Sequence, residues 1–159
     1  LRLRFLEIYS EHLAEGTRLF DGFELVLESL ETRGLPWGIV TNKPGWLTDP
    51  LLAALGLDRR AACAVSGDTL AERKPHPLPL LHAAGLIGVP PEHCVYVGDA
   101  ERDIQAGRAA GMTTVVASYG YLAPQDDPAS WLPHGIVATP QELLDWLAAD
   151  TAPDARALA

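Results

Sequence analysis

Short apolar runs separated by helix-like segments constrain the fold of this chain more than any other feature. The runs are WGIVT (37–41), ACAV (62–65), CVYV (94–97) and TTVVA (113–117). Strands that are apolar on both faces are typical of a parallel sheet covered by helices on each side, because both faces of such strands are buried. The sequence therefore predicts a three-layer α/β fold.

The segments between the runs have helical spacing. Phe23, Val26, Leu27 and Leu30 follow the i, i+3, i+4, i+7 pattern of one helix face, and Gly34 is well placed to end that helix. Further helices are expected near residues 1–13, 49–55, 77–84 and 100–110, and a short strand is expected at 135–138. A capping-box pattern at 139–142 opens a last helix, and residues 151–159 are expected to be a loose tail.

Length and charge limit the classes of function. A chain of 159 residues suits about one domain with a hydrophobic core, and its formal net charge is −9. This acidic balance argues against nucleic-acid binding, which depends on clustered cations, and no apolar run reaches the roughly 18 residues of a membrane helix. Cys63 and Cys94 lie in apolar runs and are interpreted as free thiols of a reducing cytoplasm.

Polar residues follow the predicted strands where a parallel sheet would bind a ligand, at the carboxyl ends. Thr41 and Asn42 follow the first run, residues 66–68 the second and Asp99 the third, while Lys74 lies on a loop between the last two. Each has an ordinary alternative. Thr41 could be a turn hydroxyl, Lys74 a solvated charge and Asp99 a helix cap.

Asp99 and Asp103 are the strongest pair of candidates. Residues four apart share one face of a helix, so both carboxylates are expected at the same rim. Two carboxylates about 4 Å apart repel by roughly 4 kcal/mol at an effective dielectric constant of about 20, and a divalent cation between them reverses that sign. Few carboxylates together with water and substrate phosphate suit Mg²⁺. Lys43 could contact an anion beside Thr41.

As an ordered set, GIVTNKP (38–44), KPHP (74–77) and VYVGDAERD (95–103) resemble the second, third and fourth motifs of the haloacid dehalogenase-like hydrolases. The resemblance runs from about residue 22 to residue 146, and within the family it is to the phosphoglycolate phosphatase group. The stretch SYGYLAPQDDPASW (118–131) also resembles the related N-acetylmuramic acid 6-phosphate phosphatases. The resemblance implies a Rossmann-like hydrolase core at 19–150, preceded at 1–18 by the remnant of a helical cap and its return linker.

The resemblance also implies an activity and a role for each candidate. Members of the family hydrolyse small phosphate monoesters through an aspartyl-phosphate intermediate, a form of covalent catalysis. Thr41, with backbone N–H groups near Asn42, would bind the phosphoryl group, and Lys74 would offset its charge. Asp99 would hold Mg²⁺, with Asp103 completing or orienting the metal shell. The partner would be a small phosphorylated metabolite, with a slight preference for 2-phosphoglycolate.

One motif of the family is not matched. The first motif, Asp-x-Asp-Gly-Thr, supplies the nucleophile, and LFDGF (19–23) is not a substitute because it has one acid and no Thr. We expect the nucleophile upstream of Leu1. In the family, the strand of this motif lies between the strands ending at Thr41 and Asp99. Without it, residues 1–159 alone are expected to have a gap with unpaired backbone groups, each costing roughly 1–3 kcal/mol, and to be unstable and inactive.

Two other readings are weaker. A non-catalytic binding domain could keep this scaffold after losing the nucleophile. A phosphate-receiver domain has similar topology, but it should show an acidic pair after its first strand, and none is seen in the sequence.

Overall fold

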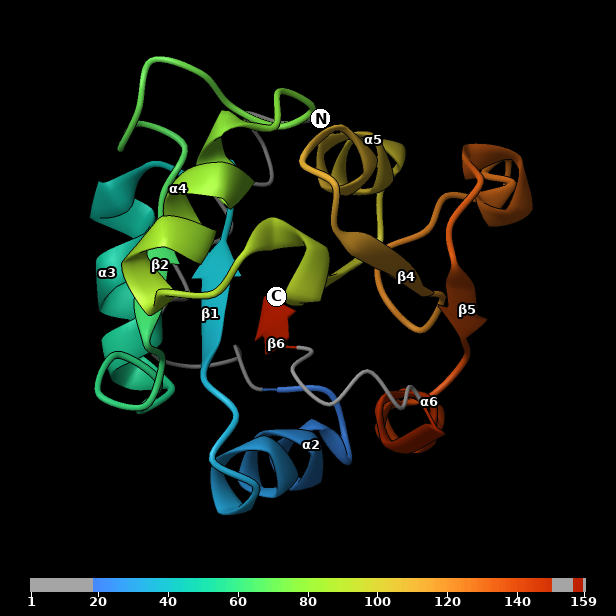
Figure 1. Cartoon of the computed structure of the whole chain (residues 1–159), viewed down its shortest axis with the longest axis horizontal. Helices are drawn as coiled ribbons and strands as arrows, with labels where there is room; N and C mark the ends of the chain where they lie inside the picture. Colours follow the sequence, from blue (N-terminus) through green and yellow to red (C-terminus); the bar gives the residue numbers. More distant parts are fainter. Residues whose placement is uncertain (1–18, 150–155, 159) are drawn as a thin grey trace.

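A parallel sheet forms the centre of the molecule (Figure 1), in a computed structural model that describes residues 19–149 and 156–158. The strand order is β2-β1-β6-β3-β4-β5, and all neighbours are parallel. The strands are β1 (Trp37–Val40), β2 (Cys63–Val65), β3 (Cys94–Gly98), β4 (Thr113–Ala117), β5 (Gly135–Val137) and β6 (Arg156–Leu158). The predicted parallel α/β architecture is confirmed. The helix expected at 1–13 and the expected cap remnant at 1–18 lie outside the described residues.

Helices cover both faces of the sheet. In Figure 1, α4 and α5 lie on one side of the strands, and α2 and α6 lie on the other. The helices are α2 (Phe23–Thr32), α3 (Gly45–Ala54), α4 (Leu78–Ile87), α5 (Glu101–Ala109) and α6 (Pro140–Ala149), with 3-10 turns η1 (Pro91–His93) and η2 (Pro128–Trp131). Within residues 19–149 and 156–158, no helix is long and apolar enough to cross a membrane.

Helix α3 begins earlier than its sequence pattern predicts. The expected start was near residue 49, but the helix begins at Gly45 and includes Pro50. Pro50 has no N–H, so it removes one backbone hydrogen bond from the helix. The hydroxyl of Thr48 donates to the carbonyl of Pro44 at 3.1 Å, which adds a side-chain bond to the first turn.

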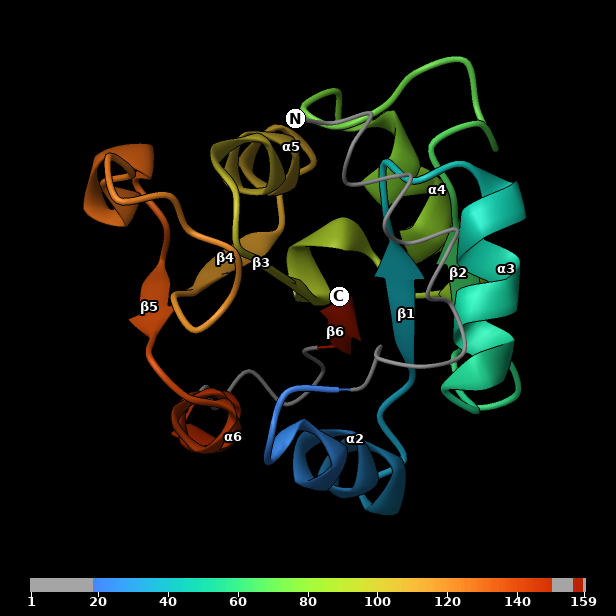
Figure 2. The ribbon, with the colours of Figure 1, turned by 180° about the vertical axis from the view of Figure 1, so that it is seen from behind.

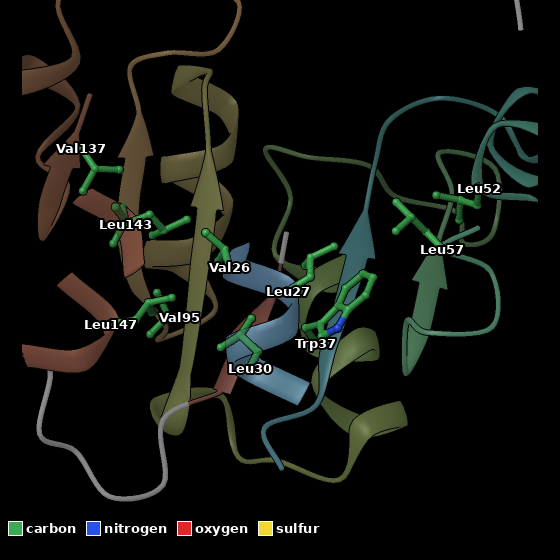
Figure 3. Packing of buried hydrophobic residues seen from close by; sticks show 11 residues of the cluster. Val26, Leu27, Leu30, Trp37, Leu52, Leu57, Val95, Val137, Leu143 and Leu147 are labelled. Carbon is green, nitrogen blue, oxygen red and sulfur yellow. The ribbon is translucent and has the colours of Figure 1, made fainter. Parts of the chain in front are cut away.

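Two apolar clusters, one on each face, hold the helices to the sheet. On one face, Val26, Leu27 and Leu30 of α2 lie between Val95 of β3 and Trp37 of β1 (Figure 3). The other face packs α4 and α5 against the strands through a second cluster, whose buried members are Val40, Val65, Leu80, Ala83, Ala84, Cys94, Tyr96, Ala106, Ala110 and Met112. Along β3, the side chain of Val95 therefore enters the first cluster, and those of Cys94 and Tyr96 enter the second, because successive side chains of a strand point to opposite faces.

The segment expected to be a loose tail contains the central strand. Arg156–Leu158 forms β6 between β1 and β3, which do not pair with each other (Figure 2). Ala157 pairs with Trp37 and Val95, and Leu158 pairs with Gly38 and Tyr96. The expectation of a loose tail is therefore wrong for 156–158, and so is the expectation of a gap with unpaired backbone groups between β1 and β3. The physical reason is that the inner edges of β1 and β3 both need backbone partners, which a parallel strand supplies.

Gly107 allows α5 to approach the sheet closely, so a larger residue at this position should destabilise the protein. A Cβ atom there would lie 2.5 Å from Cγ2 of Thr114, which is fully buried. We expect Gly107→Ala to lower the free energy of unfolding by about 1–3 kcal/mol, because the overpacked side chain forces its neighbours to shift. Urea unfolding measures this.

Gly85→Ala is the matched control, because Gly85 lies in α4 with no atom within 4 Å of the new Cβ. It should stabilise the protein by up to about 1 kcal/mol through helix propensity. Equal midpoints for the two variants would contradict the close packing at Gly107.

Candidate active site

The loop after β1 fixes the backbone of Lys74. Thr41 continues the ladder of β1 by donating its N–H to the carbonyl of Val65 at 2.9 Å. The side chain of Asn42 then binds the Lys74 backbone twice. Asn42 Oδ1 accepts the Lys74 N–H at 3.1 Å, and Nδ2 donates to the Lys74 carbonyl at 2.9 Å. This reciprocal pair places the lysine, whose bond to Pro75 is cis, above the carboxyl ends of the strands.

Lys74 is buried at this edge, with 9% of its surface exposed, so it is not a solvated surface charge. Its Nζ donates to the carbonyl of Val40 at 2.9 Å and to the hydroxyl of Tyr96 at 2.7 Å. It also lies 2.8 Å from Oδ1 of Asp103. The three N–H bonds of the ammonium therefore have three oxygen partners.

Asp103, rather than Asp99, caps helix α5. Its Oδ2 accepts the backbone N–H groups of Asp99 and Ala100, each at 3.1 Å, while Oδ1 pairs with Lys74. Both carboxylate oxygens are thus engaged by the protein. A Cβ at Gly98 would lie 2.7 Å from Cγ of Asp103, so a glycine is required for this approach.

Asp99 lies on the outer side of the same site. Its Oδ2 accepts the backbone N–H of Tyr121 at 2.9 Å, which leaves Oδ1 for another ligand. Lys43 is close enough to Lys74 and Asp99 for both charges to shift its pKa. Burial lowers the pKa of Lys43 most, the positive charge of Lys74 lowers it further, and the negative charge of Asp99 raises it. The site therefore combines two lysines and two carboxylates.

The hydroxyl of Thr41 lies next to Lys43. Thr41 Oγ1 accepts the Lys43 N–H at 3.1 Å, so the hydroxyl hydrogen can still be donated to an anion. The loop after β2 supports this turn. Gly67 donates to the Lys43 carbonyl at 2.7 Å, and Asp68 accepts the Gly45 N–H at 2.8 Å. A Cβ at Gly67 would lie 2.6 Å from the carbonyl carbon of Asn42, so this contact requires glycine. Residues 66–68 therefore support the site without entering it.

The carboxylates at this edge fit Mg²⁺ only if water and substrate supply most of the ligands of the ion. Among residues 19–149 and 156–158, no group of three or more His, Cys, Asp or Glu could hold a metal ion. Mg²⁺ is commonly bound by one or two carboxylates, with water and substrate phosphate completing the shell. Asp99 can offer Oδ1 to such an ion. Asp103, with both oxygens engaged, is suited to orienting the site.

Two participants were not found from the sequence. Tyr96 lies within the apolar run CVYV, where nothing distinguishes a packing tyrosine from one whose hydroxyl faces Lys74. Tyr121 acts through its backbone N–H, which residue identity does not reveal. The glycines in VYVGD and SYGY were available as signals, since glycine often marks the close approach of backbone to a side chain.

The Lys74–Asp103 pair predicts a non-additive effect on stability. We expect Lys74→Met to lower the free energy of unfolding by about 3–5 kcal/mol, because it leaves a buried carboxylate without its partner. Adding Asp103→Asn should recover part of this loss, since it removes the charge while keeping an oxygen for the helix cap. Urea unfolding of both single variants and the double variant measures the coupling. Strictly additive losses would contradict the pair.

Alkaline pH should destabilise the folded protein. Burial raises the pKa of Tyr96 to about 12, above its ordinary value of 10.0. Burial lowers the pKa of Lys74, but the charges of Tyr96 and Asp103 outweigh it, so the net shift is upward. A raised pKa means that the unfolded chain loses its proton first. The free energy of unfolding should therefore fall as pH rises from about 10 towards about 12.

Tyr96→Phe should flatten this fall, although the variant should be less stable at neutral pH because Lys74 loses one acceptor. Urea unfolding as a function of pH measures both effects. The same slope in Tyr96→Phe and wild type would contradict the role of this phenol.

Comparison with known proteins identifies a family for the chain. Residues 2–117 match the haloacid dehalogenase-like hydrolase family. The chain is 54% identical to a phosphoglycolate phosphatase of Xanthomonas campestris pv. campestris over 139 residues, which cover 87% of the chain and 63% of that protein. It is 42% identical to an N-acetylmuramic acid 6-phosphate phosphatase of Pseudomonas aeruginosa over 147 residues, or 92% of the chain and 65% of that protein.

The fold has a similar counterpart among solved structures. A predicted phosphoglycolate phosphatase from Haemophilus somnus superposes with a TM-score of 0.81 and 32% identity, over 92% of the chain and 64% of that protein. The chain spans less than two thirds of the length of each of these three relatives.

Proposed function

The chain belongs to the haloacid dehalogenase-like hydrolases, and on that premise we propose that it supplies the phosphate-binding and Mg²⁺-binding groups of a phosphatase acting on a small phosphate monoester. The observation that carries the proposal is the buried ammonium of Lys74, held by Val40, Tyr96 and Asp103 at the edge where the strands end. A fixed positive charge beside polar strand ends suits a phosphoryl group, whose catalysis depends on electrostatic stabilisation.

The substrate we favour is 2-phosphoglycolate. The support is the higher identity to a phosphoglycolate phosphatase, 54%, against 42% for the N-acetylmuramic acid 6-phosphate phosphatase. The muramic acid sugar phosphate is the alternative, and the stretch SYGYLAPQDDPASW supports it. We place the reaction in the cytoplasm, where the thiols of Cys63 and Cys94 stay reduced.

Each residue of the site has a role in the proposal. The Thr41 hydroxyl and the backbone N–H groups near Asn42 donate to phosphoryl oxygens. Lys74 and the half-buried Lys43 offset the negative charge of the group, and Asp103 orients Lys74 and the start of α5. Asp99 would hold Mg²⁺, which when bound neutralises charge on the phosphoryl oxygens.

We assign no nucleophile within residues 1–159. The chain has no match to the Asp-x-Asp motif expected for the attacking carboxylate. In the family that motif is expected between the strands corresponding to β1 and β3. Here β6 lies at that position, and its residues Arg156, Ala157 and Leu158 include no acid.

The test is a turnover assay with Mg²⁺ and either 2-phosphoglycolate or N-acetylmuramic acid 6-phosphate, carried out on a full-length protein that supplies the nucleophile as well as residues 1–159. We expect phosphate release from both, with the higher kcat/KM for 2-phosphoglycolate. Asp99→Asn should lower kcat/KM about 100-fold or more, the scale of losing one preorganised electrostatic group, while the control Gly85→Ala should not change it.

Three outcomes would contradict parts of the proposal. A many-fold higher kcat/KM for the sugar phosphate would overturn the substrate preference. Full activity of Asp99→Asn would overturn the metal role. Binding of orthophosphate without turnover of any phosphate ester would favour a non-catalytic binding domain instead.

A further inference from the structure

The segment that follows β4 lies against Asp99, although the sequence alone did not place it in the site. This segment is Tyr119–Tyr121, and two backbone hydrogen bonds fix the turn that leads into it. The N–H of Ser118 donates to the Val137 carbonyl at 2.8 Å, and Gly120 donates to the Ala117 carbonyl at 3.0 Å. The segment therefore extends from the ladder of β4 and β5, and its position is fixed by the sheet.

Two contacts join this segment to the Asp99 carboxylate. The backbone N–H of Tyr121 donates to Oδ2 of Asp99 at 2.9 Å. Gly120 lies so close that a Cβ there would be 2.5 Å from Cβ of Asp99 and 2.9 Å from its Cγ. The backbone of Gly120 lies outside the left-handed region, so the nearness of Asp99 is what excludes a larger residue.

Aromatic packing holds the segment from outside. Phe20, which precedes α2, meets the ring of Tyr119 edge to face, with centroids 5.4 Å apart, and the ring of Tyr121 at 5.9 Å. Such pairs contribute beyond the area they bury. Burial and, as a smaller cause, the negative charge of Asp99 together raise the pKa of Tyr119 to about 12, in keeping with a short separation.

We propose that Tyr119–Tyr121 is a positioning element that fixes the orientation of the Asp99 carboxylate, so that Oδ1 is presented to the cation. This rests on the proposed function, in which Asp99 holds Mg²⁺. The Tyr121 amide engages Oδ2 and sets the rotation of the carboxylate, and Gly120 leaves the space in which the Asp99 side chain lies. Partners of this kind fix the orientation of a metal ligand without contacting the metal.

The test is Mn²⁺ binding to the full chain, measured by loss of the free-ion EPR signal. Mn²⁺ stands in for Mg²⁺ because carboxylate and water ligands suit both ions. We expect Gly120→Ala to raise the Kd for Mn²⁺ about tenfold or more, the scale of losing such a supporting contact. Gly85→Ala, which adds the same methyl group in open space, should leave the Kd unchanged.

Combining Gly120→Ala with Asp99→Asn distinguishes a loss of positioning from a general structural defect. If Gly120 acts through Asp99, Gly120→Ala should add no further loss of Mn²⁺ affinity once Asp99→Asn is present. Phe20→Ala, which loosens the segment without adding atoms beside Asp99, should weaken Mn²⁺ binding less than Gly120→Ala does. In the full-length protein that supplies the nucleophile, raising Mg²⁺ should restore the turnover of Gly120→Ala towards that of wild type, which a purely structural defect would not allow.

The outcomes distinguish this inference from the proposed function. Wild-type Mn²⁺ affinity in Gly120→Ala, or an equal further loss in the Asp99→Asn background, would overturn the positioning role and leave the phosphatase proposal standing. A wild-type chain that binds no Mn²⁺, together with a full-length protein that supplies the nucleophile and still hydrolyses no phosphate ester, would overturn both.

Discussion

The buried ammonium of Lys74 is the interaction on which the site depends. Moving a charged ammonium out of water is costly unless each N–H bond finds an acceptor. The three acceptors come from different elements, since Val40 belongs to β1, Tyr96 to β3 and Asp103 to α5. The Tyr96 hydroxyl also lies 3.1 Å from the Val40 carbonyl. Lys74 therefore links β1 to β3, two strands that share no backbone hydrogen bonds, at the edge where the substrate is proposed to bind.

This arrangement places two ammonium groups in the site of a protein that is acidic overall. The chain carries a formal net charge of −9, yet Lys43 and Lys74 lie together beside Thr41. Since Lys74 is paired with Asp103, its charge is held in place without making the site strongly positive. The half-buried Lys43 adds a second cation, and its backbone N–H donates to the Thr41 hydroxyl. A local field of this kind can attract a small dianion even when the molecule as a whole repels one.

The spacing of apolar residues in the sequence predicted much of the fold. Strand β4 was predicted with its observed bounds, 113–117, and β1 and β3 within one residue. The convergence of Thr41, Lys74 and Asp103 also followed, because the carboxyl ends of parallel strands meet at one edge. The exact start of α3 did not follow from the sequence, because α3 contains Pro50 in its interior, where proline is usually excluded.

What the sequence did not predict depends on contacts between distant parts of the chain. The Tyr121 amide is a backbone group, so only its position beside Asp99 identifies it. Tyr96 required knowledge of which layer its side chain enters. Strand β6 has the weakest local signal, since Arg-Ala-Leu has no strand pattern of its own and pairs because two strand edges are available.

The position of β6 also has a consequence for the order of folding. It comes last of the six strands in sequence and lies in the middle of the sheet, so Trp37 pairs with a residue near the other end of the chain, Ala157. The pairs β1–β2 and β3–β4 join strands that are neighbours in sequence and close shorter loops. Because loop closure costs more entropy as the loop lengthens, these two half-sheets should form first, and β6 should join them late. Among the described residues, the two halves would therefore meet through their side-chain layers before the ladder of β6 connects them.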